Sequence, residues 1–201
     1  MKRKVLLIYT GGTIGMEKDY ETGSLRAFDF GNIFQKLPEM KLIECEISVH
    51  PFKKPLDSSD MGPQEWKLIA NYIGKNYDNY DGFLILHGTD TMSYTASALS
   101  EMLKKLHKPV VHIGDLRTDA KENLLTSLYY ASLYENDKAA IQEVTVYFEY
   151  KLLRGNRTLK YSAEYFDAYQ TPNYPVLGQS GVHLNIEKDF LWRSETEENF
   201  S

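Results

Sequence analysis

The sequence predicts an α/β domain in which helices flank a mainly parallel sheet. Two observations lead to this prediction. Compact apolar runs alternate along the chain with segments whose apolar residues recur at helical spacing. Two of the runs also lead directly into glycines, at Gly11 and Gly88, as buried parallel strands do where the chain turns toward the next element.

The first predicted elements are two strands and a helix. Lys4–Tyr9 is a compact apolar run typical of a buried parallel strand, and Leu42–Val49 is a second strand in which polar and apolar residues alternate. Pro63–Lys75 predicts a helix, because proline suits the first helical turn. One face of that helix carries its apolar residues, Trp66, Ile69, Ala70 and Ile73.

The middle of the chain continues the alternation. Gly82–His87 predicts a strand, Tyr94–Leu106 a helix and Pro109–Ile113 another strand. The inward side of the helix is expected to carry Leu99, Met102, Leu103 and Leu106.

The last elements of the series are a helix and a strand. Asp119 is placed to cap a helix that runs to about Tyr134, with Glu122 positioned as in a capping box. Val144–Phe148 then closes the series as a strand. The whole pattern predicts a three-layer sheet of the Rossmann or flavodoxin type.

Beyond Arg154 no clear period remains, yet the chain is rich in aromatic residues that would be costly to leave in water. We therefore expect an ordered, irregular segment up to Gly181. The tyrosine-rich stretch 161–174 suits either an interface or packing within the domain. The predicted organisation is one α/β domain over residues 1–185 and a linker or frayed tail over 186–201.

Composition excludes several classes of protein. The 201 residues are 42% hydrophobic and 25% charged, with a net charge of -5 and no basic stripe, so nucleic acid is not an expected partner. The only cysteine, Cys45, excludes a disulfide framework, and its strand-like surroundings predict a buried thiol. The apolar run near Met1 is too short for a signal peptide, and no stretch is long enough to span a membrane, so we expect a cytoplasmic protein.

Ligands of an open α/β sheet bind at the carboxyl ends of its strands, so residues that follow strands are the candidates for chemistry. After the first strand comes Thr10-Gly11-Gly12-Thr13-Ile14-Gly15. Its spacing fits neither a dinucleotide-binding nor a phosphate-binding loop. The threonines that flank the diglycine suit a nucleophile on a mobile loop, or simply a glycine turn with capping hydroxyls.

A second candidate, His87-Gly88-Thr89-Asp90-Thr91-Met92, follows the Gly82–His87 strand and places a hydroxyl beside a carboxylate. The alternative interpretation is that Asp90 or Thr91 caps the following helix. A metal site would need two ligands beyond His87 and Asp90, and none is apparent at a compatible spacing. We therefore expect His87 to be a packed, hydrogen-bonded residue and predict no metal.

These two segments, some 70 residues apart in the sequence, together resemble the L-asparaginase family. The resemblance runs from Lys4 to about Leu184. Further segments agree with it, and the last two of them resemble the cytoplasmic type I branch: Leu56-Asp57-Ser58-Ser59-Asp60-Met61, Arg117-Thr118-Asp119-Ala120-Lys121-Glu122-Asn123 and Leu153-Arg154-Gly155-Asn156-Arg157-Thr158-Leu159-Lys160.

The resemblance implies hydrolysis of L-asparagine to L-aspartate and ammonia through a threonine acyl-enzyme, without metal or cofactor. Thr13 would be the nucleophile, and Thr89, Asp90 and Lys160 would form the hydrogen-bonded set that activates a nucleophile or water. Backbone amides near Thr89 would stabilise the oxyanion. Ser58 and Asp90 would hold the α-carboxylate and α-amino groups of the substrate. The expected substrate-binding residues are Gly12, Asp57, Ser58, Ser59, Gly88, Thr89 and Asp90.

The sequence departs from the family pattern in three places. The segment around Val111 and His112 is shorter than in the family, where it contributes to the substrate pocket. The tyrosine usual near the nucleophile is replaced by Ser24, unless Tyr20 takes its place. The chain also ends about where the family's C-terminal domain begins, and in relatives the active site lies between subunits. The resemblance therefore also implies a homo-oligomer, a dimer or a tetramer.

Alternatives to an active asparaginase stay open at this point. Glutamine is the nearest rival substrate, because one methylene is worth only about 1–3 kcal/mol in a pocket. The chain could instead be an impaired domain that only binds an amino acid or partner subunits. A third alternative is the asparaginase-like subunit of a tRNA-dependent amidotransferase, whose relatives carry an additional N-terminal domain.

Overall fold

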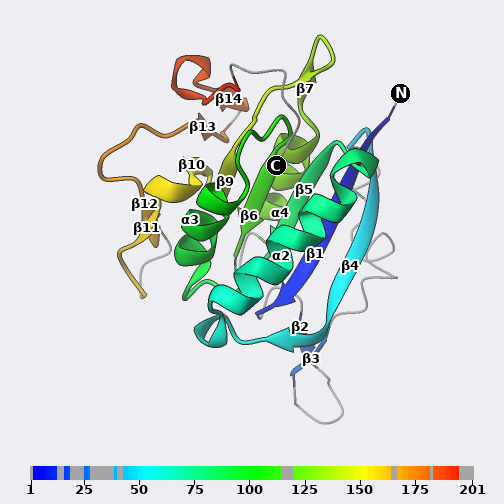
Figure 1. Cartoon of the computed structure of the whole chain (residues 1–201). Helices are drawn as coiled ribbons and strands as arrows, with labels where there is room; N and C mark the ends of the chain where they lie inside the picture. Colours follow the sequence, from blue (N-terminus) through cyan, green and yellow to red (C-terminus); the bar gives the residue numbers. More distant parts are fainter. Residues whose placement is uncertain are drawn as a thin grey trace.

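An eight-stranded sheet with helices on both faces forms the centre of the computed structural model (Figure 1). Helices α2 (Pro63–Asn76) and α3 (Met92–Met102) cover one face, and α4 (Ala120–Ser132) covers the other. The α/β class with a mainly parallel, helix-flanked sheet is thus confirmed. The structure describes residues 2–12, 16–18, 25–27, 39, 43–114, 120–163, 167–181 and 183–194.

The order of the strands decides where a ligand can bind. Across the sheet the order is β14 (Asn185–Ile186), β13 (Gly178–Gln179), β10 (Lys151–Arg154), β9 (Val144–Phe148), β6 (Val110–Ile113), β5 (Gly82–Leu86), β1 (Arg3–Gly11) and β4 (Cys45–Leu56). The pairings from β4 to β9 are parallel, and those from β9 to β14 are antiparallel. Because β4 and β5 flank β1 on opposite sides, the chain changes winding direction at β1. In flavodoxin-like sheets, the crevice between the equivalents of β1 and β5 is the ligand site.

Short hairpins and 3₁₀ helices complete the fold. The two-stranded pieces are β2 (Met16–Lys18) with β3 (Leu25–Ala27), β7 (Tyr134–Glu135) with β8 (Lys138–Ala139), and β11 (Leu159–Lys160) with β12 (Tyr169–Gln170). The 3₁₀ helices are η4 (Ser58–Asp60), η5 (Tyr77–Asn79), η6 (Gly155–Arg157) and η7 (Lys188–Phe190). The β11–β12 pair is the piece that matters for the site described below.

The core consists of two layers that the central strands supply by alternation. On β1, Leu6 and Ile8 face the α2 and α3 side, whereas Val5, Leu7 and Tyr9 face α4. Both sets are buried, as the continuous apolar run predicts for a strand covered on two faces. The strand ends are therefore held rigidly by packing on both sides of the sheet.

The sequence prediction for the end of α3 was wrong. Helix α3 ends at Met102 rather than at Leu106, and the Met102 side chain is 39% exposed instead of buried. Leu103 and Leu106 are nevertheless buried, because the chain turns across the core directly after the helix. The predicted strand Val144–Phe148 is β9, with the predicted bounds, and it is the last parallel strand; the antiparallel strands β10, β13 and β14 extend the sheet beyond it.

Cys45 begins the edge strand β4 and is half-buried. Burial raises the pKa of its thiol to about 11, an effect that hydrogen bonding to Ser132 opposes. A thiol with so high a pKa is almost entirely protonated near neutral pH and is a poor nucleophile. The prediction of a buried thiol was wrong in degree, since Cys45 is only half-buried.

Candidate active site

The loops that follow β1 and β5 touch backbone to backbone. Gly12 has a φ of +82°, and a Cβ added there would lie 2.6 Å from the Gly88 Cα. The Thr10 hydroxyl, at the end of β1, donates to the Leu86 carbonyl at the end of β5 at 2.9 Å. Glycine is therefore required at Gly12 both by its left-handed backbone and by the close approach. The predicted crevice between the two strands is thus closed tightly at its base.

The turn after β4 joins the same place. Ser58 is buried, and a Cβ added at Gly88 would lie 2.7 Å from the Ser58 Oγ. The Thr91 hydroxyl donates to the Ser58 carbonyl at 2.5 Å, which ties this turn to the start of α3. The Asp57 carboxylate accepts the Ser59 backbone N–H at 2.9 Å, so it caps its own 3₁₀ turn and remains exposed together with Ser59.

Lys160 reaches Thr89 and Asp90 from a segment some 70 residues away. Its Nζ lies 3.3 Å from the Thr89 Oγ1 and 2.8 Å from the Asp90 Oδ1. The lysine side chain is 17% exposed and the Asp90 side chain 66% exposed. An ammonium that donates to both oxygens stabilises negative charge that develops on the threonine oxygen, and the carboxylate balances the ammonium charge. The structure thus brings together three of the four predicted catalytic residues.

The β11–β12 pair also brings a residue that the sequence analysis missed. Lys160 on β11 pairs directly with Tyr169 on β12. Tyr169 is fully buried, packs edge-on against Phe148, and donates its hydroxyl proton to the Thr89 carbonyl. Burial, and then the nearby Asp90 carboxylate, raise the pKa of the Tyr169 hydroxyl, so it stays a donor at neutral pH. Its only sequence signal was membership of the aromatic stretch 161–174.

His87 is fully buried behind the site, in a chain of hydrogen bonds. Its Nδ1 lies 2.7 Å from the Gly88 carbonyl, which can only accept, so Nδ1 carries the proton. Its Nε2 then accepts from the Thr95 hydroxyl at 2.9 Å, and the Thr95 oxygen accepts from the Trp66 Nε1–H at 3.0 Å. Burial lowers the pKa of His87 to about 4, against a smaller opposing effect of the Gly88 carbonyl. The predicted packed, hydrogen-bonded histidine is what the structure contains.

His112 lies beside His87, with ring centroids 6.4 Å apart. It is fully buried on β6, and its Nδ1 lies 3.3 Å from the Thr145 carbonyl. Within the described part of the chain, its Nε2 has no hydrogen-bond partner. Burial and then the neighbouring His87 lower the pKa of His112 to about 3. Next along the chain, a Cβ added at Gly114 would lie 2.7 Å from the Thr89 Cγ2, so β6 also ends against the site.

Several predicted residues fall outside the described part of the chain. These are the nucleophile candidate Thr13, the loop residues Tyr20 and Ser24, and the segment 115–119 with the predicted cap Asp119. The described neighbours of Thr13 are Gly11 and Gly12, which lie at the site. The roles of Thr13, of Ser24 and of the shortened segment after His112 therefore stay predictions.

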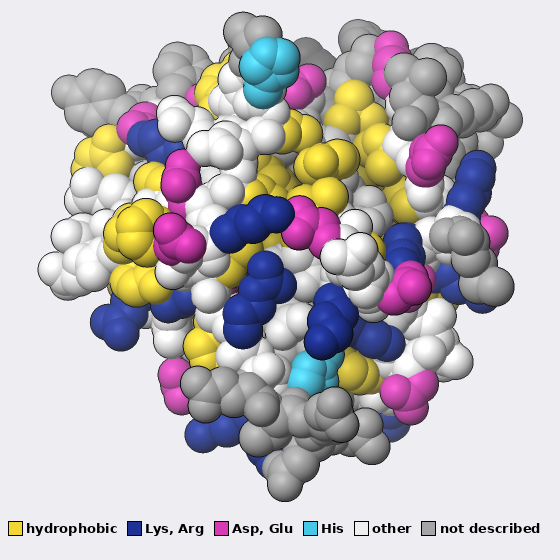
Figure 2. All heavy atoms as spheres, turned by 90° about the horizontal axis from the view of Figure 1, so that it is seen from above, with side chains coloured by type: hydrophobic (Ala, Val, Ile, Leu, Met, Phe, Trp, Pro, Cys, Tyr) yellow, Lys and Arg dark blue, Asp and Glu magenta, His cyan; other side chains and the backbone are white. Residues whose placement is uncertain are grey.

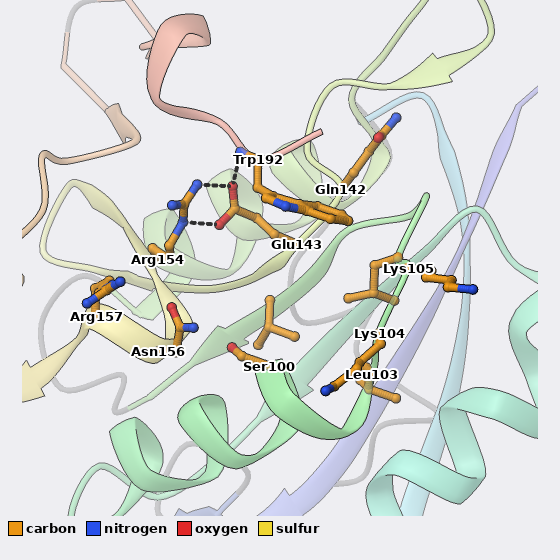
Figure 3. A pocket seen from close by; sticks show the side chains of 12 residues that line it. Ser100, Leu103, Lys104, Lys105, Gln142, Glu143, Arg154, Asn156, Arg157 and Trp192 are labelled. Carbon is orange, nitrogen blue, oxygen red and sulfur yellow. Dashed lines mark hydrogen bonds and ion pairs between the residues drawn. The ribbon is translucent and has the colours of Figure 1, made fainter. Parts of the chain in front are cut away.

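A separate pocket of about 390 Å³ lies at the amino ends of the parallel strands, whereas the candidate site lies at their carboxyl ends (Figure 3). Its lining includes Leu103, Lys104, Arg157 and Trp192. Arg154 also lines it and donates to the Glu143 carboxylate, from Nε to Oε2 at 2.6 Å and from Nη2 to Oε1 at 3.1 Å. On the face viewed from above, Lys and Arg side chains gather near the middle beside exposed hydrophobic side chains (Figure 2). This pocket contains none of the residues predicted for chemistry.

Among the residues that the structure describes, no group of three or more His, Cys, Asp or Glu side chains is arranged to hold a metal ion. None of the helices described is long and apolar enough to cross a membrane.

Comparison with known proteins agrees with this geometry. The family model described as "Asparaginase, N-terminal" matches residues 4–191. L-asparaginase 1 of Escherichia coli K12 is 45% identical over 193 residues, which cover 91% of this chain and 55% of that protein. Two solved structures have TM-scores of 0.82. L-asparaginase I of Vibrio cholerae is 39% identical, and the thermostable L-asparaginase of Thermococcus kodakarensis is 30% identical.

The alignments also show how much of the relatives the chain represents. It is matched over 100% of its length by the Vibrio cholerae structure and over 97% by the Thermococcus kodakarensis structure. It covers only 60% and 58% of those two chains. The chain therefore spans little more than half the length of the relatives that it matches.

Proposed function

This chain belongs to the asparaginase family, and from that premise we propose that it hydrolyses L-asparagine to L-aspartate and ammonia. The observation that carries the proposal is the approach of Lys160 to both Thr89 and Asp90 at the carboxyl ends of β1 and β5. A surface ion pair alone would not need a threonine hydroxyl in the same hydrogen-bonded set.

The proposed reaction is a two-step acyl transfer. The Thr13 hydroxyl oxygen attacks the side-chain amide carbon and loses its proton, and the C–N bond of the tetrahedral intermediate breaks as the nitrogen takes up a proton and leaves as ammonia. Water then attacks the acyl-threonine ester, which releases L-aspartate and restores the hydroxyl. Thr89, which accepts from Lys160 while Asp90 balances the lysine charge, would relay the proton: it accepts one as it passes on its own hydroxyl proton.

The substrate would lie over the junction of the β1, β4 and β5 loops. Gly12, Gly88 and Ser58 form its base, and their close packing leaves their positions little freedom. Ser58 and Asp90 would contact the α-carboxylate and α-amino groups of the substrate. Asp57 and Ser59, which are exposed, would line the rim of the substrate site. The exposed Asp90 carboxylate is suited to an ammonium group, and backbone N–H groups suit the α-carboxylate.

Two further expectations belong to the whole protein rather than to this site. By similarity to the type I branch, we propose that it is cytoplasmic and that it forms a homo-oligomer, a dimer or a tetramer. We further propose that residues 1–185 are the N-terminal domain and that 186–201 lead toward a second domain; the family model itself extends to residue 191, and Ile186 still pairs in β14.

The test is ammonia release from L-asparagine by the wild-type chain and by Thr89→Val, which removes the hydroxyl and keeps the branched shape. The proposal expects turnover that the substitution lowers by about 10³-fold or more. L-Glutamine, tested in parallel over the same range, gives the ratio of kcat/KM for the two amides. A folded wild-type chain with no turnover would contradict the proposal.

The binding-only alternative makes a different prediction in calorimetry. An impaired domain would bind L-asparagine or L-aspartate with a measurable heat and release no ammonia. It is favoured by the short segment around Val111 and His112, and by the fact that the chain covers only 55% of the Escherichia coli protein and 60% of the Vibrio cholerae structure. Binding without turnover would decide for it.

A further inference from the structure

We propose that Tyr169 and His87 are positioning residues that orient two consecutive peptide groups, so that the N–H groups of Thr89 and Asp90 face the substrate. This inference rests on the proposed function. It names the side chains that would hold the oxyanion-binding backbone amides in place. Neither side chain touches the reacting atoms. Each acts through a backbone carbonyl.

The orientation follows from the geometry of the peptide bond. His87 Nδ1–H donates to the Gly88 carbonyl, and the Tyr169 hydroxyl donates to the Thr89 carbonyl. The described residues contain no cis peptide bond, and in a trans peptide the C=O and the following N–H point in opposite directions. Donors that fix the two carbonyls on the protein side therefore turn the N–H groups of Thr89 and Asp90 away from it.

Those two N–H groups have no acceptor in the part of the chain that the structure describes. Among the described residues, neither donates to a backbone or side-chain acceptor, whereas the next bonds of the segment run from Tyr94 and Thr95 back to the Thr91 carbonyl. The two amides precede α3, an eleven-residue helix whose N-terminal end favours negative charge. Preorganised amides at such a place stabilise an oxyanion without a cost of reorganisation during the reaction.

Each donor is itself fixed by the fold. His87 is held by Thr95 and Trp66 in the tautomer that carries its proton on Nδ1. Its low pKa keeps it neutral, so this arrangement persists at the pH of the reaction. Tyr169 is buried against Phe148, whose ring centroid lies 4.8 Å away.

One hairpin thus serves the site twice. Lys160 and Tyr169 face each other across the β11–β12 pairing, and both contact Thr89: the lysine through its side-chain oxygen and the tyrosine through its carbonyl. Tyr169 therefore connects the position of the Lys160 segment with the orientation of the Thr89–Asp90 peptide. A tyrosine that served only packing would need no hydroxyl at this place.

The decisive variant is Tyr169→Phe, which removes one oxygen and keeps the ring packed. Tyr174→Phe is its matched control, because Tyr174 lies in the same part of the chain and donates to the Phe190 carbonyl at 3.0 Å, away from the site. Both variants lose one tyrosine-to-carbonyl bond. We expect Tyr169→Phe alone to lower kcat by about 10- to 100-fold with KM changed less than about 3-fold, since the contact acts in the transition state.

The histidine is tested by rescue. His87→Leu removes the donor to the Gly88 carbonyl, whereas the side-chain amide of His87→Asn places a donor close to the position of Nδ1. We expect the asparagine variant to keep at least about 10-fold more kcat than the leucine variant when both are folded. Equal loss in the two would overturn the role of His87, and an unchanged kcat in Tyr169→Phe would overturn that of Tyr169.

A second measurement does not depend on turnover. In ¹⁵N-labelled protein, Tyr169→Phe is expected to shift the Asp90 amide resonance and to speed its hydrogen exchange, and Tyr174→Phe to leave both unchanged. An Asp90 amide unaffected by Tyr169→Phe would overturn the inference even in an active enzyme. A wild-type chain without turnover whose Asp90 amide responds in this way would instead contradict the proposed function and leave the peptide orientation standing.

Discussion

At the scale of single residues, we predict that Lys160 contributes little to stability and much to the proposed reaction. Its partner carboxylate, Asp90, is 66% exposed, so solvent screens the pair. We predict that Lys160→Met changes the free energy of unfolding by less than about 1 kcal/mol. The same variant should lower kcat for L-asparagine by about 10²- to 10⁴-fold, because it removes the charge beside Thr89.

The chain offers a matched control for this prediction. Lys151 forms an ion pair of 2.7 Å with Asp167, against 2.8 Å for Lys160 with Asp90, and among the described residues Lys151 donates to neither Thr89 nor Asp90. Lys151→Met should resemble Lys160→Met in urea unfolding and differ from it in the ammonia assay. If the two variants have the same activity, Lys160 is only another surface cation.

The two buried histidines predict a loss of stability in acid. Both are neutral in the folded state, because burial lowers the pKa of His87 to about 4 and that of His112 to about 3. In the unfolded chain, their pKa values return to about 6.5. The unfolded state therefore binds more protons below pH 6.5. The free energy of unfolding therefore decreases as the pH falls from 6.5 toward 4. The decrease is up to about 1.4 kcal/mol per pH unit for each histidine.

His112→Leu tests this prediction, because it removes one of the two groups and also the unpartnered Nε2. We expect urea unfolding of this variant at pH 7, 6 and 5 to show a visibly shallower decline of stability than the wild type. His183→Gln, at an exposed position, is the control and should keep the wild-type slope. An identical decline in all three proteins would place the acid sensitivity elsewhere.

At the scale of elements, the site depends on loops that approach each other without side chains between them. Gly12→Ala would place a Cβ 2.6 Å from the Gly88 Cα at a φ of +82°, so the β1 and β5 loops would have to move apart. We predict a destabilisation of about 2–4 kcal/mol together with loss of activity. Thermal unfolding and the ammonia assay measure the two effects.

Gly62→Ala is the matched control for the loop prediction. A Cβ at Gly62 would meet only the Glu65 Oε2 at 3.7 Å, an ordinary contact. We expect this variant to keep wild-type activity and to differ in stability by less than about 1 kcal/mol. A similar loss in both variants would mean that the contact between Gly12 and Gly88 is not what limits the loop.

The central elements were predictable because each carries its own local signal. Continuous apolar runs marked β1, β5, β6 and β9, and Pro63 marked the start of α2. The hairpin that joins β9 to β10 had no such signal. Its turn places Glu149 and Tyr150 at φ values of 46° and 65°, a backbone that usually selects asparagine and glycine. Strand β4 was also underestimated, because its second half contains Pro51 and Pro55, which an edge strand tolerates.

At the scale of the whole molecule, the site could be predicted only in part. Gly12, Ser58, Thr89 and Asp90 follow strands, and the rule for parallel sheets places such residues at one edge. Nothing local distinguished Lys160 from a surface lysine, and only the family resemblance singled it out. Tyr169 was missed because its role depends on a long-range contact with a backbone carbonyl, which leaves no trace in spacing or periodicity.

Self-association is the remaining prediction at this scale. Leu159 and Tyr161 are each 46% exposed next to Lys160, an unusual placement for two large hydrophobic side chains beside a site. We expect sedimentation velocity to show a concentration-dependent oligomer that the double variant Leu159→Gln, Tyr161→Gln weakens by about 10-fold or more in dissociation constant. Tyr129→Gln, at an exposed tyrosine on α4, is the control. Association that is unchanged in the double variant would place the interface on another surface.

The hydrogen bond from Trp66 to Thr95 has a spectroscopic consequence. The chain contains two tryptophans, which lie at opposite ends of the parallel strands. Trp66 belongs to the chain of hydrogen bonds behind His87. Trp192 lines the pocket at the amino ends of the strands and is 42% exposed. In a Trp192→Phe protein, the remaining indole emission would come only from the side of the site. A change of that emission on addition of L-aspartate would then report ligand binding in real time, without any added dye.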